Sequence, residues 1–242
     1  MKDKIVQRKS IGIIGGMGPQ ASSQLLRMII DLSASEFGAK NGEDFPEVLL
    51  LSLPISDFIS DKNKAKLALE VIKNKISLLN EANLGCLAIA CNTAHLFLEE
   101  LQTFTKIPFV SVIDEVSNRV QKNGIKRIGL LASPTTIRSK IYQEALSARG
   151  INTIVPINKE SKVIEKIIRN VIGGKNSIKD TGLVHSIAES LTKRGAEGVI
   201  LGCTELNLVF SKNSSFPVFD SLEILAHALL RKRHKLNTIR SI

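Results

Sequence analysis

The chain has 242 residues, of which 43% are hydrophobic and 23% charged, a composition typical of globular rather than disordered proteins. Its formal net charge is +10, but it has one Tyr, no Trp and no helix-turn-helix or RNA-binding signature, so we expect no specific nucleic-acid partner. The first ten residues lack the apolar core of a signal peptide, and no apolar run could span a bilayer, which predicts a cytoplasmic protein without a membrane partner.

Strands and helices alternate in the first half of the chain. Short apolar runs predict the strands, and apolar residues at helical spacing predict the helices. The run at 48–53 is continuously apolar, which favours a strand buried on both faces. The predicted strands are 11–14, 48–53, 86–90 and 109–113, and the predicted helices begin after Pro19 or cover 68–79 and 94–101.

The same alternation returns in the second half. The predicted strands are 127–131, 152–157, 198–201 and 217–219, and the predicted helices are 135–149, 159–172, 178–194 and 222–230. A dense basic cluster at 231–235 follows the last predicted helix, and we interpret it as a solvated tail. Alternating strands and helices imply parallel sheets that are covered on both faces.

The two halves resemble each other, since residues 9–15 are similar to 126–132 and a cysteine follows the third strand of each half. The repeat predicts an α/β fold of two similar Rossmann-like lobes, with mainly parallel four-stranded sheets related by a pseudo-twofold axis. We expect residues 1–115 plus 220–242 to form one lobe and 116–219 the other. Ligands of open α/β sheets bind beyond the carboxyl ends of the strands, which predicts a site in the interlobe cleft.

The chain has three cysteines, and two of them stand where a strand is predicted to end. Cys91 and Cys203 are each followed by small polar residues suited to begin a helix, where the helix dipole and free N–H groups favour a thiolate. The alternative is that they are small buried apolar residues, which is our interpretation of Cys86. No cysteine or histidine spacing resembles a zinc site, so we expect no metal.

A glycine-rich loop follows the first predicted strand. Gly16-Met17-Gly18-Pro19-Gln20-Ala21 formally fits the dinucleotide pattern Gly-x-Gly-x-x-Ala, but the acid expected after the second strand is missing. Pro19 also removes one backbone donor. We favour a loop whose N–H groups hold a small anion, with a plain strand-to-helix turn as the alternative.

Three motifs together resemble the aspartate/glutamate racemase family: residues 11–19, Cys91-Asn92-Thr93-Ala94-His95 and Gly202-Cys203-Thr204-Glu205. The resemblance implies two α/β lobes, a homodimer, and racemisation of an amino acid to its D or L form without pyridoxal phosphate, another cofactor or a metal. It implies that Cys91 and Cys203 are the opposed acid and base at Cα. The implied substrate contacts are Met17, Gly18, Asn92, Thr93, Thr135, Thr136, Thr204 and Glu205.

The sequence departs from the aspartate-specific pattern in two places. It has Ile55-Ser56-Asp57-Phe58 where those members carry Pro-Asp-Arg, and Ile172 stands near their Lys, the nearest substitute being Lys175. Ser-Asp-Phe is similar to the broad-specificity branch. The alternatives are an isomerase or decarboxylase acting on a dicarboxylic acid, and a non-catalytic protein that binds a small carboxylate. For His95, the sequence leaves a site role and a capping or packing role open.

Overall fold

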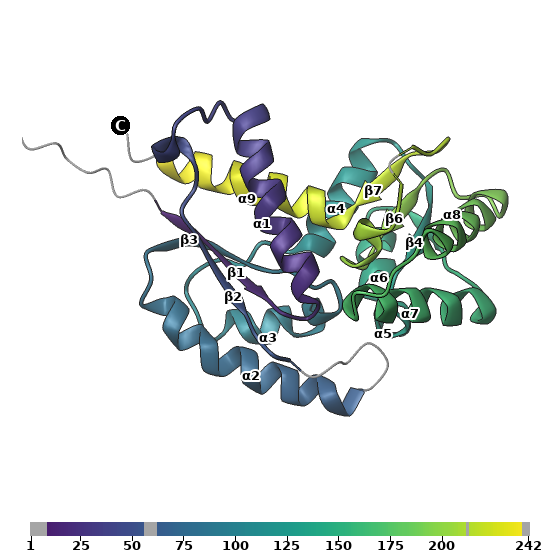
Figure 1. Cartoon of the computed structure of the whole chain (residues 1–242), viewed down its shortest axis with the longest axis horizontal. Helices are drawn as coiled ribbons and strands as arrows, with labels where there is room; N and C mark the ends of the chain where they lie inside the picture. The colour runs from purple at the N-terminus through teal and green to yellow at the C-terminus, as the bar shows by residue number, and fades with distance from the viewer. Residues whose placement is uncertain (1–8, 56–61, 212, 239–242) are drawn as a thin grey trace, which may run out of the picture.

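The computed structural model describes residues 9–55, 62–211 and 213–238, which form two α/β lobes (Figure 1). In Figure 1, the first lobe combines the purple and blue elements with the yellow C-terminal helix, and the second lobe is green. Within these residues, no helix has the length and apolar character needed to cross a membrane.

The sheet of the first lobe has three parallel strands in the order β2-β1-β3. Alternate residues of β1 point to opposite faces, as expected for a strand. Ile11 and Ile13 belong to a core with α1, α4 and α9, whereas Ile14 belongs to a core with α2. The elements are β1 (Ser10–Gly15), α1 (Pro19–Ser35), β2 (Val48–Ser52), α2 (Lys62–Asn80), β3 (Leu84–Ile89), α3 (Leu98–Gln102) and α4 (Val112–Lys122), with a 3-10 turn η1 (Gly42–Asp44).

The second lobe has a four-stranded parallel sheet in the order β5-β4-β6-β7. Helices α7 and α8 cover one face, and α6 packs with α4 on the other. The elements are β4 (Arg127–Leu131), α5 (Pro134–Ser139), α6 (Ile141–Ser147), β5 (Asn152–Ile154), α7 (Asn158–Ile172), α8 (Ile178–Lys193), β6 (Val199–Leu201) and β7 (Val218–Asp220).

Both sheets share one topology, because the first strand of each unit lies between the second and the third. This confirms the two similar lobes that the repeat predicts. The predicted strand at 109–113 is wrong, and the first sheet therefore has three strands. Phe109 forms an isolated bridge with Leu87, and α4 then begins because the Ser111 side chain caps its first turn by accepting from the Asp114 N–H (3.2 Å).

Two further predictions of local structure are corrected. The strand β2, which lies at the edge of its sheet beside β1, is not buried on both faces, since none of its five residues is fully buried and Leu49 is exposed. The predicted helix at 135–149 is broken into α5 and α6 at Lys140, which adopts a left-handed conformation with φ 61°. The strand predicted at 152–157 ends at Ile154.

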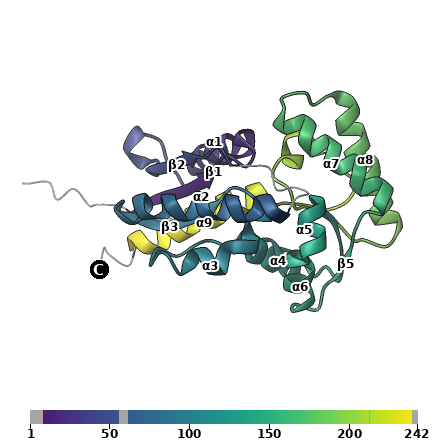
Figure 2. The ribbon, with the colours of Figure 1, turned by 90° about the horizontal axis from the view of Figure 1, so that it is seen from below.

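The C-terminal helix α9 (Ser221–Thr238) begins directly after β7 in the second lobe and packs against α1, α4 and β3 of the first (Figure 2). The basic cluster therefore lies inside a helix rather than in a tail. Arg231 pairs with Glu115 (3.0 Å), and buried Arg233 donates to the Phe45 carbonyl (3.4 Å). The lobe boundary at 115 stays a prediction, since α4 itself packs on both α9 and α6.

Candidate active site

Cys91 and Cys203 occupy equivalent places in the two lobes. Each lies two residues beyond the third strand of its sheet, after Ile89 and Leu201, and each is buried, with 8% and 7% of its surface exposed. Charge on Cys91 contributes to a raised pKa of Cys203, after burial and Glu205. Cys86 lies inside β3 in the apolar core, as the sequence analysis expects.

The pKa of both thiols is raised, in each case chiefly by burial. Burial and the nearby charge of Glu205 raise the pKa of Cys91 to about 12, although hydrogen bonds from the N–H groups of Ala94 and Thr93 and from the Thr93 hydroxyl oppose this. Burial, the Glu205 charge and the hydrogen bond to Glu205 raise the pKa of Cys203 well above its ordinary value.

The predicted lowering of the thiol pKa values by helix N-termini is therefore wrong for this structure. Neither cysteine is followed directly by an α-helix. Short 3-10 turns begin instead at Thr93 and Leu206, namely η2 (Thr93–Phe97) and η3 (Leu206–Leu208). Such short turns align few peptide dipoles, so the cost of burying a charge outweighs them.

Glu205 is a buried carboxylate in direct contact with the second thiol. Its Oε2 accepts hydrogen bonds from Cys203 Sγ (3.0 Å) and Thr204 Oγ1 (3.0 Å), and 3% of its surface is exposed. Its Oε1 is buried without a hydrogen-bond partner among the residues that the structure describes. Burial raises the pKa of Glu205, partly offset by the hydrogen bond from Cys203.

The glycine-rich loop closes against both lobes. Gly16 has φ 95°, and a Cβ there would lie 2.1 Å from the Leu53 carbonyl oxygen. Gly18 has φ 120°, and a Cβ there would lie 2.1 Å from Glu205 Oε1. Both positions therefore require glycine, for conformation and for space. Met17 packs partly buried in the core of the first lobe.

A cluster of hydroxyl groups joins the lobes beside Cys91. Thr93 Oγ1 lies 3.0 Å from Ser133 Oγ and 2.8 Å from Thr136 Oγ1. Thr135 is buried next to them and accepts from Arg138 Nη2 (3.3 Å). Sequence reasoning missed Ser133, although a Ser-Pro pair at the start of α5 is a helix N-cap signal, and its Oγ does accept from the Thr136 N–H (3.2 Å).

Asn92 links the lobes through a second network. Its Nδ2 donates to Ser221 Oγ (3.0 Å), and its Oδ1 accepts from the Tyr142 hydroxyl (2.6 Å). Sequence reasoning missed Tyr142 and Ser221, which come from α6 and α9. Gly202, in the second cysteine motif, is the one sequence feature here that bears on Tyr142, because a Cβ at this position would lie 3.2 Å from the Tyr142 ring.

His95 holds the Cys91 turn in place. Its Nε2 accepts from the Val112 N–H (3.1 Å), so the ring proton lies on Nδ1, which donates to the Cys91 carbonyl (2.9 Å). Burial lowers the pKa of His95 to about 4. The imidazole is therefore a neutral packing group at pH 7, bonded to the backbone on both sides.

The positions at which this chain departs from the aspartate-specific pattern are not among the site contacts given above. Ser56, Asp57 and Phe58 lie outside the described residues. Lys175 is exposed in the connection between α7 and α8. Among the described residues, no group of three or more His, Cys, Asp or Glu side chains could hold a metal ion.

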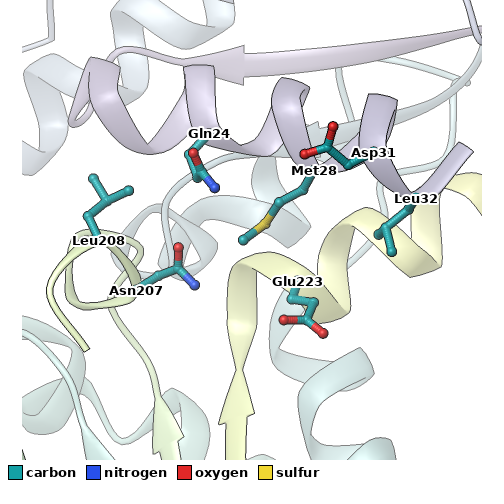
Figure 3. Close-up of a pocket in the computed structure, with 7 residues that line it drawn as sticks. All are labelled: Gln24, Met28, Asp31, Leu32, Asn207, Leu208 and Glu223. Atoms are coloured by element: carbon teal, nitrogen blue, oxygen red, sulfur yellow. The ribbon is translucent and has the colours of Figure 1, made fainter. Parts of the chain in front are cut away.

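A pocket of about 480 Å³ lies between α1 of the first lobe and η3 and α9 (Figure 3). Met28 extends from α1 toward the opposite wall, which carries Asn207 and Glu223. None of the predicted site residues lines this pocket. It is therefore separate from the cysteine pair, whose thiols are buried.

The fold is that of a two-lobed α/β protein with a buried cysteine at the equivalent place in each lobe. Residues 14–229 match the family described as Asp/Glu/hydantoin racemase. The chain therefore belongs to the Asp/Glu/hydantoin racemase family, whose named activities are isomerase reactions.

Similar proteins cover nearly the whole chain. The broad specificity amino-acid racemase RacX of Bacillus subtilis (strain 168) is 27% identical over 219 residues, which are 89% of this chain and 94% of that relative. An aspartate racemase homologue from Pyrococcus horikoshii OT3 is 30% identical with a TM-score of 0.78, covering 93% and 99% of the two chains. The aspartate racemase of Picrophilus torridus is 27% identical with a TM-score of 0.79, covering 93% and 94%.

Proposed function

We propose that the protein is a cofactor-independent amino-acid racemase that uses Cys91 and Cys203 as opposed acid and base at Cα. One observation carries the proposal: a buried thiol stands at the equivalent position of each of the two similar lobes, two residues beyond the third strand. Relatives named as amino-acid racemases support it, since RacX aligns with 89% of the chain.

The reaction balances on the two thiols alone. One cysteine, as a thiolate, takes the Cα proton and becomes a thiol, and the other, as a thiol, gives its proton to the opposite face and becomes a thiolate. The carbanion between these steps needs hydrogen-bond donors at the substrate carboxylate. Burial of both thiols excludes water, which strengthens such electrostatic stabilisation.

The proposed substrate contacts fall into two groups, one for the ammonium group and one for the carboxylate of the substrate. Glu205 Oε1 is a buried acceptor without a described partner, which suits it to receive the substrate ammonium group. Thr93, two residues after Cys91, shares a buried hydroxyl cluster with Thr136, next to buried Thr135, and these hydroxyls suit the substrate carboxylate. Asn92, Thr204 and the loop of Met17 and Gly18 complete the proposed site.

We propose broad rather than strict aspartate specificity. Strict recognition of a side-chain carboxylate favours a bidentate Arg, and the segment Ile55-Ser56-Asp57-Phe58 has none. The similarity to RacX, which is named as a broad specificity enzyme, supports the same proposal. We further propose a homodimer that acts in the cytoplasm.

The test is a panel of L-amino acids incubated with the protein in D2O. Loss of the Cα–H signal by NMR, together with inversion by chiral chromatography, is expected for several amino acids with uncharged side chains. Exchange with aspartate alone would contradict broad specificity. No exchange with any amino acid, while carboxylates still raise the melting temperature, would instead indicate a binding protein.

A further inference from the structure

The two thiols differ in one side-chain partner. The backbone N–H groups of Thr93 and Ala94 lower the pKa of Cys91, and the N–H of Glu205 does the same for Cys203, so backbone donors serve both thiols. Cys91 also receives a hydrogen bond from the Thr93 hydroxyl. Cys203 donates its own hydrogen bond to the carboxylate of Glu205, with Sγ 3.0 Å from Oε2. A carboxylate accepts from a thiol and repels a thiolate, so it favours the protonated form.

The two side chains that give the thiols unlike surroundings, those of Thr93 and Glu205, stand at equivalent positions of the repeat. Thr93 is the second residue after Cys91, and Glu205 is the second residue after Cys203. Both side chains are buried and cross to the other lobe, Thr93 to Ser133 in the loop after β4 and Glu205 to Gly18 in the loop after β1. One position of the repeat therefore supplies a donor in one lobe and an acceptor in the other.

We propose that Glu205 is a positioning residue that keeps Cys203 protonated, so that Cys91 is the first base and Cys203 the first acid of the resting enzyme. This inference rests on the proposed function. It assigns the two opposed roles to particular cysteines, which the duplicated fold alone leaves equivalent.

The other titratable groups near Cys203 also favour its protonated form. Around Cys203 they are Glu205, Cys91 and Tyr142 of α6, and Asp220 at the end of β7 acts on Tyr142. Charge on any of these groups would be negative, so none offsets a thiolate at Cys203. His95, bonded at the Cys91 turn, is neutral at pH 7 because burial lowers its pKa to about 4. Glu205 contacts Cys203 directly and affects Cys91 only through its charge.

The proton balance of one turnover follows. The Cys91 thiolate takes the Cα proton, and the Cys203 thiol gives its proton to the opposite face of the carbanion. This leaves a thiolate beside the Glu205 carboxylate, which the carboxylate disfavours. After the product leaves, water enters the site, and a proton passes through it from Cys91 to Cys203, which restores the starting form.

The test is the initial rate of alkylation of each cysteine by iodoacetamide, because the thiolate is the reactive form. The intact wild-type protein is treated without substrate from pH 7 to 10, and each site is quantified by peptide mass spectrometry. We expect Cys91 to react about tenfold or more faster than Cys203, the effect of one hydrogen bond to a charged group. Cys86, buried inside β3, is an internal control for reagent access.

The informative variant is Glu205→Gln, which keeps the side-chain size and removes the charge. We expect the ratio of Cys91 to Cys203 alkylation to fall about tenfold, with Cys203 reacting at lower pH than in the wild type. The exposed Glu189→Gln in α8 is the matched control and should leave the ratio unchanged. Circular dichroism and the melting temperature verify that the variant folds.

Two outcomes would overturn the inference: faster alkylation of Cys203 than of Cys91 in the wild type, or an unchanged ratio in a folded Glu205→Gln protein. Neither measurement uses an amino-acid substrate. Failure of the proposed function would instead appear as the absence of Cα–H exchange in the wild type, so the two failures are distinguishable.

Discussion

The turn after β3 and the turn after β6 are built on one plan, but they create different chemical environments. In each turn, the residue four positions after the cysteine bonds to a segment that directly precedes or begins a helix. His95 accepts from the N–H of Val112 at the start of α4, and Asn207 donates to Asp220 at the end of β7, just before α9. The residues that follow the two cysteines differ at each of these four positions, and the difference used in our proposal lies two positions after the cysteine, where the first turn has Thr93 and the second has Glu205. The repeat thus supplies cysteines at matching positions, and these two side chains give them unlike surroundings.

The largest effect is expected when each of the two thiols is removed in turn. Cys91→Ala and Cys203→Ala should each lower the racemisation rate at least about a hundredfold, the usual contribution of a positioned acid or base. Chiral chromatography measures the loss. Cys86→Ala, which removes the third thiol, should retain activity, and a Cys91→Ala or Cys203→Ala variant at the wild-type rate would disprove the paired roles.

Because the neutral His95 ring is buried and bonded to the backbone on both sides, the protein should lose stability in acid. The folded pKa of about 4 lies below the ordinary 6.5, so the unfolded chain binds this proton first as pH falls. The stabilisation is complete above pH 6.5 and is lost toward pH 4, at a cost of up to about 3 kcal/mol in the free energy of unfolding. Urea denaturation at pH 7 and pH 4 measures it.

His95→Asn should remove this part of the pH dependence. His185→Asn, in the second lobe, is the control, since His185 Nε2 likewise accepts from a backbone N–H, that of Ser211 at 3.0 Å. If the His95→Asn protein loses as much stability between pH 7 and pH 4 as the wild type, the assignment of a neutral buried imidazole is wrong.

Gly18→Ala should displace the Glu205 side chain from its place against the loop after β1. Its Cβ would meet Glu205 Oε1, and the φ of 120° adds strain, so we expect the free energy of unfolding to fall by about 2–3 kcal/mol. Gly38→Ala is the matched control, since φ there is 75° and nothing lies within 4 Å of the added Cβ, so only about 1 kcal/mol is expected. Equal losses would show that the Glu205 contact adds nothing.

Thr93→Val should have the smallest effect, because Ser133 and Thr136 can still bond to each other at 3.0 Å. We expect a loss of about 1 kcal/mol in the free energy of unfolding. Thr103→Val, at an exposed site where the hydroxyl bonds only to the Glu100 carbonyl (2.7 Å), is the control. An effect no larger than that of the control would remove Thr93 from the contacts that join the lobes.

The sequence predicts the fold well where periodicity is strong. Strand and helix patterns locate β1, β4, α7 and α8 closely, and the repeat predicts the shared strand order. The apolar run around Phe109 looks like a strand, but the Ser111 cap begins α4 there instead. Local pattern cannot reveal such competition between a cap and a strand.

The site is predicted only in part, because its contacts join segments far apart in the chain. The motifs single out Cys91, Cys203 and Glu205 from their own neighbourhoods. Tyr142 and Ser221 meet Asn92 only through the packing of the two lobes, which no short motif encodes. The raised pKa of each thiol is likewise a result of burial, which depends on the whole fold.

The position of α9 has a consequence for how the protein is made. This helix is the last element that the structure describes, and its apolar residues share a core with Ile11 and Ile13 of β1. During synthesis the first lobe emerges early, but one face of its sheet stays incompletely covered until residues 221–238 have left the ribosome. The strand β1 must therefore wait for a helix that is translated much later before its packing is complete.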